Sequence, residues 1–200
     1  MRFSFIAMVR LLINIRYSKK AKRLPEFLNK EEIIRLINVI ENKKHKLIVK
    51  LIYSAGLRVG EVVKLKIRDF EFSYNYGWIR NGKGNKDRLF IIAKKLKNEI
   101  IDFIEKNKIG YDDYLFEGYK GHLTVRTVQV IVKEAAKRAK ITKNVYPHML
   151  RHSFATHLIQ NNYTVTDVQP LLGHKNLETT MLYLHISPKF INIQSPFDSL

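Results

Sequence analysis

The chain has 200 residues, of which 46% are hydrophobic, and this is enough for one packed domain with extensions and excludes disorder throughout. Its 36 Lys and Arg residues outnumber 18 Asp and Glu residues, and the formal net charge of +18 indicates a polyanionic partner. Nucleic acid is the first candidate and an anionic membrane surface is the second. No cysteine is present, which excludes disulfides and thiolate metal sites and fits an intracellular, cytoplasmic protein.

Residues 1–24 form a basic segment without an acidic residue. Its apolar stretch, residues 3–15, is interrupted by Arg10 and is shorter than the roughly 20 residues of a membrane-spanning helix. It also lacks a small-residue cleavage site, so we expect neither a signal peptide nor a membrane span. The segment can be an amphipathic helix with a basic linker that follows a phosphate backbone, and a frayed terminus explains it equally well. Binding of this segment to anionic lipid is a weaker alternative.

Hydrophobic periodicity predicts a mainly α-helical chain of the α+β class. Asn29 with Glu32 three residues later resembles a capping box at the start of a first helix. A second helix over residues 45–54 should end at Gly56, because glycine suits the left-handed position after a helix.

One small antiparallel sheet of about three strands is predicted between residues 69 and 92, where aromatic and β-branched residues alternate with turn signals. Lys83 should lie at a hairpin tip, where flanking glycines let the backbone approach a ligand. Pro170 must bend or shorten a helix near the end of the chain. Further helices are expected over residues 96–108, 124–140 and 164–172, and from Asn176 onward.

Groups that can bind and attack a phosphate are concentrated between residues 146 and 185. Pro147 suits the first turn of a helix, so His148 and Arg151 should lie at i and i+3 on one face. Tyr183 follows in the same region. A tyrosine beside Arg and His groups can act as a covalent nucleophile, with cationic donors facing the charge that develops on an anionic reactant.

Arg58 and Glu61 form another pair at i and i+3, at the start of a helical turn. Such pairs are usually surface ion pairs, so this pair alone would indicate only structure. Glu61 can hold the neighbourhood of Arg58 in place without neutralising a bound phosphate directly. Lys83 can reach into a groove as a point charge or proton donor, although a Walker-type phosphate loop is excluded because its pattern is absent.

Four motifs stand in order along the chain, and together they carry a resemblance that none of them would carry alone. They are Gly56–Glu61, Gly82–Arg88, Pro147–His157, and Leu171–Asn176 with Tyr183 after it. In this order and spacing they resemble the tyrosine recombinase (phage integrase) family, and within it the Xer branch, archaeal Xer proteins included. The resemblance covers residues 25–187 and implies the catalytic-domain fold of that family.

The resemblance implies a DNA strand-transfer reaction. The hydroxyl of Tyr183 would attack a DNA phosphodiester, giving a 3′-phosphotyrosyl link and a free 5′-hydroxyl, and a 5′-hydroxyl from another strand would reverse the step. Arg58 and Arg151 would bind the non-bridging oxygens and stabilise the transition state. Neither ATP nor a metal or other cofactor is expected, because the nucleophile is a side chain and the neutralising charge comes from Arg, Lys and His.

Three further residues receive roles from the same resemblance. Lys83 would be the general acid for the leaving 5′-oxygen, His148 its acid/base partner, and His174 a hydrogen-bond donor to the phosphate. Glu61 matches a supporting carboxylate. The remaining histidines are expected to be structural or surface residues: His45, His122, His152, His157 and His185.

The resemblance also implies a domain organisation and partners. Residues 1–24 would be at most the last helix of an N-terminal core-binding domain, 25–187 the catalytic domain, and 188–200 a tail that docks on its own domain or on a neighbouring protomer. Double-stranded DNA would be the partner of a homo-tetramer on paired sites, with no membrane involved. Because residues 1–24 would supply at most one helix of the DNA clamp, a partner-dependent or non-catalytic DNA-binding protein is an alternative, and strand relaxation like that of type IB topoisomerases is another.

Overall fold

The structure, a computed structural model, describes residues 26–80, 87–119, 121–173 and 193–200. The expectations for residues 1–24 and for a helix beginning at Asn176 fall outside these ranges. In chain order the elements are α2 (Lys30–Asn38), α3 (Lys43–Ala55), α4 (Val59–Val62), η1 (Ile67–Asp69), β1 (Phe70–Glu71), η2 (Phe72–Tyr74), β2 (Tyr76–Ile79), β3 (Arg88–Ile91), α5 (Lys94–Lys106), β4 (Glu117–Gly118), β5 (Gly121–His122), α6 (Val125–Arg138), α7 (Pro147–Gln160), α8 (Val165–Leu171) and η4 (Pro196–Ser199).

Local signals in the sequence place the ends of α2 and α3. At the start of α2 the Asn29 side chain accepts the N–H of Glu32, and the Glu32 carboxylate accepts the N–H of Asn29, which confirms the predicted capping box. Helix α3 begins after Asn42, whose side chain accepts a backbone N–H. It ends at Gly56, which has φ +59° and therefore the expected left-handed conformation.

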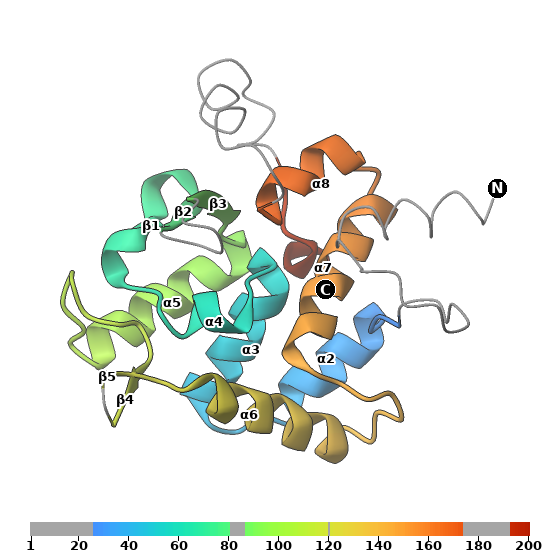
Figure 1. The fold of residues 1–200 in the computed structure, drawn as a ribbon, viewed down its shortest axis with the longest axis horizontal. Helices are drawn as coiled ribbons and strands as arrows, with labels where there is room; N and C mark the ends of the chain where they lie inside the picture. Colours follow the sequence, from blue (N-terminus) through green and yellow to red (C-terminus); the bar gives the residue numbers. More distant parts are fainter. Residues whose placement is uncertain (1–25, 81–86, 120, 174–192) are drawn as a thin grey trace, which may run out of the picture.

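The sheet lies on one side of the helices (Figure 1) and has the antiparallel order β1-β2-β3. This confirms the predicted small sheet. All four residues of β3 are buried, since α3 and α8 contact this strand. A separate hairpin of β4 and β5 was not predicted, because strands of two residues are too short to show a period.

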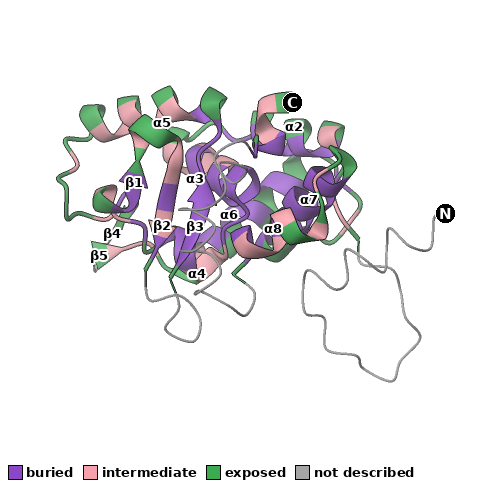
Figure 2. Cartoon of the chain, turned by 90° about the horizontal axis from the view of Figure 1, so that it is seen from above, coloured by how far each residue is buried: buried purple, intermediate pink, exposed green. Residues whose placement is uncertain are grey.

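Helix α7 packs against α3, α6, α8 and η4 (Figure 1). Twelve of its fourteen residues are buried, so it lacks the polar face of a surface helix. Figure 2 shows the buried residues gathered between α4 on one side of the molecule and α5 on the other. Among the described residues, no helix has the length and apolar character needed to cross a membrane.

Residues 193–200 of the tail dock on the same chain. The Ser195 hydroxyl donates to the Ser54 carbonyl at 2.6 Å, so the tail is anchored to the last turn of α3. The Asp198 carboxylate accepts the backbone N–H of Lys94 at 3.2 Å and thereby caps the start of α5. Docking of the tail on a neighbouring protomer stays a prediction.

Replacing Gly56 by alanine should lower the free energy of unfolding by about 3 kcal/mol, because a side chain is strained at positive φ and would crowd a packed core. The added Cβ would lie 2.4 Å from Cδ1 of Phe154, which is fully buried. Urea unfolding followed by circular dichroism measures the loss. Gly60→Ala is the matched control, since its Cβ would meet nothing within 4 Å and the residue lies in α4. Equal losses in the two variants would contradict this account.

Candidate active site

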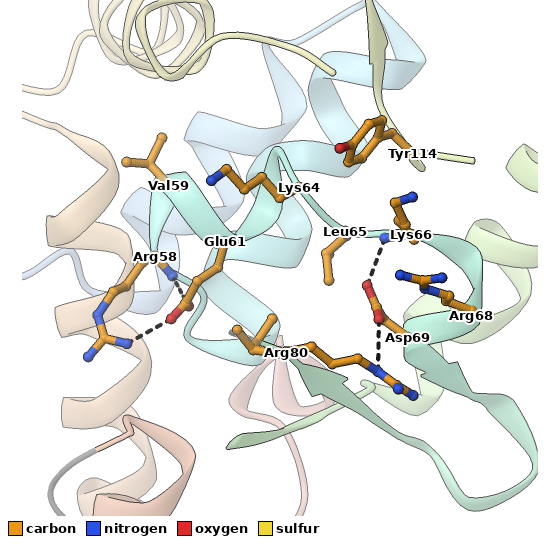
Figure 3. A pocket seen from close by; sticks show the side chains of 12 residues that line it. Arg58, Val59, Glu61, Lys64, Leu65, Lys66, Arg68, Asp69, Arg80 and Tyr114 are labelled. Carbon is orange, nitrogen blue, oxygen red and sulfur yellow. Dashed lines mark hydrogen bonds and ion pairs between the residues drawn. The ribbon is translucent and has the colours of Figure 1, made fainter. Parts of the chain in front are cut away.

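A cluster of three arginines surrounds the carboxylate of Glu61, which is 9% exposed. Arg58 Nη1 lies 2.7 Å from Oε1 (Figure 3), Arg88 Nη2 lies 2.5 Å from Oε2, and Arg151 Nη1 lies 3.8 Å from Oε2. Arg88 and Arg151 are buried, whereas the Arg58 side chain is 31% exposed. One carboxylate cannot neutralise three guanidinium groups, so the cluster keeps a surplus of positive charge, which Arg58 presents to solvent.

Each arginine reaches the cluster from a different element. Arg58 is the residue before α4, and its backbone N–H also donates to Glu61 Oε2, at 2.7 Å. Arg88 begins β3, and Arg151 lies in the second turn of α7, behind Pro147 at the start of that helix. The expectation that Glu61 holds Arg58 in place is confirmed, and the same carboxylate also holds the other two.

Backbone carbonyls at the C-terminal ends of two helices accept further N–H groups of these arginines. Arg58 Nη2 and Arg151 Nη2 both donate to the carbonyl oxygen of Leu172, the residue that ends α8, at 3.0 and 2.5 Å. Arg151 Nη1 donates to the carbonyl of Gly56 at the end of α3, at 2.5 Å. The C-terminal end of a helix carries unpaired carbonyls and partial negative charge, so it stabilises a guanidinium. Two guanidiniums therefore converge on one oxygen atom.

The charges in the cluster change the acidity of its members. Burial alone would raise the pKa of Glu61, but the charge of Arg88 and its hydrogen bond, with the charges of Arg151 and Arg58, lower that pKa from 4.5 to about 2. Burial and the charges of Arg88 and Arg58 lower the pKa of Arg151, against the effect of Glu61. A guanidinium has so high an initial pKa that Arg151 still remains charged at neutral pH.

His148 stands at the surface on the first turn of α7, next to the arginines. The loss of water around its ring, followed by the charges of Arg151 and Arg58, lowers the pKa of His148. Its ring packs edge-on against the buried ring of His152, with 5.0 Å between the centroids. Burial lowers the pKa of His152 to about 4. His148 is therefore neutral at pH 7 and can accept a proton.

The structure brings together three of the six predicted site residues: Arg58, His148 and Arg151. The other three, Lys83, His174 and Tyr183, lie outside the described residues. In the described part of the chain, no three His, Asp or Glu side chains gather in an arrangement that could hold a metal ion.

Arg88 was not assigned to the site from the sequence. Its Nε and Nη2 both donate to Glu61, and its Nη1 donates to the carbonyl of Leu171. The sequence did contain a signal, because Arg88 begins the apolar run Leu89–Ile92, which was predicted to be a strand. An arginine in a buried strand needs a buried acceptor, and Glu61 is the acceptor it finds.

The structure is a mainly helical domain with a small antiparallel sheet, in which Arg58 and Arg151 converge on one oxygen atom. These features define the class of this protein. A model of the phage integrase family matches residues 26–189, and the chain belongs to that family. Within the family it is similar to Xer proteins. It is 40% identical over 177 residues to tyrosine recombinase XerA of Pyrococcus horikoshii, a match that covers 86% of this chain and 61% of that protein. The chain thus spans less than two thirds of the relative's length.

Solved structures confirm the predicted fold class. A crystal structure of XerA recombinase matches with a TM-score of 0.70 and 31% identity, over 90% of this chain and 65% of that one. XerH site-specific recombinase, bound to a palindromic difH substrate in a post-cleavage complex, matches with a TM-score of 0.67 and 30% identity. That match covers 86% of this chain and 53% of XerH. The resemblance inferred from the four motifs is confirmed.

Glu61→Gln should lower the free energy of unfolding at pH 7 by roughly 3 kcal/mol, because the arginines lose their buried counter-charge. Since folding lowers the pKa of Glu61 from 4.5 to about 2, its contribution is complete above pH 4.5 and is lost as the pH falls toward 2. Urea unfolding over this pH range should therefore show a steeper loss of stability for the wild type than for the variant.

Glu41→Gln is the control for this prediction. It makes the same chemical change at a carboxylate that pairs with Arg138 at the surface, where the Glu41 side chain is 86% exposed. Exposed ion pairs contribute about 1 kcal/mol or less, so this variant should remain close to the wild type. If Glu61→Gln proved no more destabilising than Glu41→Gln, the central role of Glu61 would be wrong.

Proposed function

We propose that this chain contains the catalytic domain of a site-specific DNA recombinase, which breaks and rejoins strands through a covalent link to Tyr183. The observation that carries the proposal is the convergence of Arg58 and Arg151 on one oxygen, at 3.0 and 2.5 Å, within a cluster of surplus positive charge. Membership of the phage integrase family and the similarity to XerA and XerH support the same reaction. The substrate would be double-stranded DNA.

A phosphodiester carries charged oxygens. These oxygens would take the place of the Leu172 carbonyl, to which Arg58 and Arg151 donate in this structure. A non-bridging oxygen in that position would receive hydrogen bonds from Arg58 and Arg151 together. Because Glu61 and buried backbone fix both guanidiniums in advance, the donors need little reorganisation as charge develops on the phosphate. This arrangement would stabilise the transition state of attack at phosphorus.

The remaining steps follow from the chemistry of the side chains. The Tyr183 oxygen forms a bond to phosphorus while the bond to the 5′-oxygen breaks, and Lys83 gives that oxygen a proton. His148, which is neutral at pH 7, accepts the proton that the tyrosine loses, and His174 donates a hydrogen bond to the phosphate. A 5′-hydroxyl of another strand then attacks the phosphotyrosine and releases Tyr183. The energy of the broken bond is kept in the link, so ATP is not required. The nucleophile is a side chain and the neutralising charge comes from Arg, Lys and His, so the proposed steps call for no metal.

The proposal includes the organisation of the assembly. Residues 25–187 would form the catalytic domain of a homo-tetramer on paired DNA sites. The tail, residues 188–200, would leave the contacts that residues 193–200 make with their own chain and dock on a neighbouring protomer in that assembly. Residues 1–24 would be what this chain holds of a core-binding domain. The relatives named as tyrosine recombinases favour strand exchange over relaxation of supercoils, and formation of recombinant junctions instead of relaxed circles would distinguish the two.

Covalent capture tests the reaction. Wild-type protein incubated with a labelled duplex that is nicked near the cleavage position should give an adduct that survives denaturation, and Tyr183→Phe should give none. Arg58→Ala and Arg151→Ala should each slow adduct formation by about two orders of magnitude, as expected for the loss of one donor to a developing oxyanion.

Arg35→Ala is the control for the arginine variants, because Arg35 is exposed on α2. It should form the adduct at the wild-type rate. An adduct of normal yield with Tyr183→Phe would show that Tyr183 is not the nucleophile. DNA binding by the wild type without any adduct would favour the partner-dependent or non-catalytic alternative.

A further inference from the structure

An open groove of about 660 Å³ starts at Arg58 and extends along α4 to Tyr114 (Figure 3). We call it the α4 groove. One wall is α4 with the segment that follows it to Lys66, and the other wall is formed by η1 and the end of β2 at Ile79 and Arg80. None of the proposed chemical steps uses this space. Arg58 belongs to both the groove and the arginine cluster, so the two are continuous.

The lining of the groove is basic. Seven of its twelve lining residues are charged, and these are Arg58, Glu61, Lys64, Lys66, Arg68, Asp69 and Arg80. Both carboxylates already have partners, since Glu61 is held by the arginine cluster and Asp69 accepts the N–H of Lys66 at 2.9 Å. Five cationic side chains therefore face two carboxylates that already have partners, and this excess of positive charge favours an anionic ligand.

The lysines of the groove are available to such a ligand. Lys64 is exposed, and its side chain makes no hydrogen bond or ion pair with any residue that the structure describes. The Lys66 ammonium lies over the ring of Tyr114, 4.9 Å from its centroid, and therefore stands beside an aromatic face and not on a carboxylate. Flexible ammonium groups in an open basic groove suit successive phosphates of one strand.

The backbone on one wall is also accessible. Gly60 lines the groove, and a Cβ added there would meet nothing within 4 Å. A ligand can therefore approach the α4 backbone closely at this point.

Together these observations point to a second DNA-binding site: we infer that the α4 groove binds the sugar–phosphate backbone beside the cleaved phosphate, with Lys64 and Lys66 on neighbouring phosphates. This inference rests on the proposed function, because it takes the phosphate at Arg58 and Arg151 as its starting point. Contacts of this kind position DNA without reading its sequence. The groove fixes the register of the strand, so that one particular phosphate reaches the arginine pair.

The test is binding of a fluorescent duplex to the full chain, measured by anisotropy over a series of salt concentrations. The double variant Lys64→Ala/Lys66→Ala should bind about tenfold more weakly and should lower the slope of log affinity against log salt by roughly 2, one for each lost phosphate contact. Lys64→Arg/Lys66→Arg keeps both charges and should keep the slope. Circular dichroism establishes that each variant is folded.

Lys94→Ala/Lys106→Ala is the matched control. It removes two exposed lysines of α5, on the opposite side of the molecule from α4 (Figure 2), and should leave the slope unchanged. If the groove variant and the control changed the slope equally, the inference would be overturned.

Uncharged methylphosphonate linkages, placed singly on either side of the nick, locate the contacts. Wild type should lose affinity at one or two positions beside the cleaved phosphate, and Lys64→Ala/Lys66→Ala should show no further loss there. If both proteins lost the same affinity at every position, binding of DNA by the α4 groove would be refuted. The proposed reaction at Tyr183 would still stand if the wild type formed its covalent adduct. Failure of wild type to bind duplex DNA would overturn the groove and the proposed function together.

Discussion

The carboxylate of Glu61 is the constraint on which the rest of the site depends. Arg58, Arg88 and Arg151 come from the start of α4, the start of β3 and the second turn of α7, and without a shared anion their charges would repel one another in a region that excludes water. Burying charges is costly, and an apolar cluster of the same volume would often be at least as stable. The benefit of this network is geometric, since it fixes the directions of guanidinium groups that separate elements supply.

The surplus positive charge of the arginine cluster allows this fixed geometry to bind an anion. Two of the guanidiniums share the carbonyl oxygen of Leu172, and the buried side chains beneath them leave little freedom to turn away. An anion that enters such a site meets donors already oriented, which is the condition under which electrostatic stabilisation of a transition state is largest. In the proposed function, the continuous α4 groove would extend the same positive field away from the reacting phosphate, so affinity and reactivity would come from adjoining but separate surfaces.

Short-range chemistry made much of this structure predictable. The capping box at Asn29, the left-handed Gly56 and the helix that begins at Pro147 follow from a few neighbouring residues, and each was predicted from the sequence. Arg88 was not assigned, because its role depends on Glu61, which is close only after folding. The complete burial of α7 and the β4–β5 hairpin were also missed, since the first depends on neighbours on all sides and the second is too short for a pattern. Side chains that act together across long separations could be grouped only through the family resemblance.

The carbonyl oxygen of Leu172 also bears on how the unliganded protein remains folded. A site prepared for an anion would be unstable if its positive groups faced one another with nothing between them, and here the end of α8 supplies a neutral oxygen with partial negative charge. In the proposed function, an incoming phosphate oxygen would replace this backbone oxygen as the acceptor of the two guanidiniums. A small inorganic anion would compete with the Leu172 carbonyl through its contacts with Arg58 and Arg151 alone. A nucleic-acid strand would also contact the α4 groove. Under the proposed function, this internal hydrogen bonding would favour a long anion over simple salts.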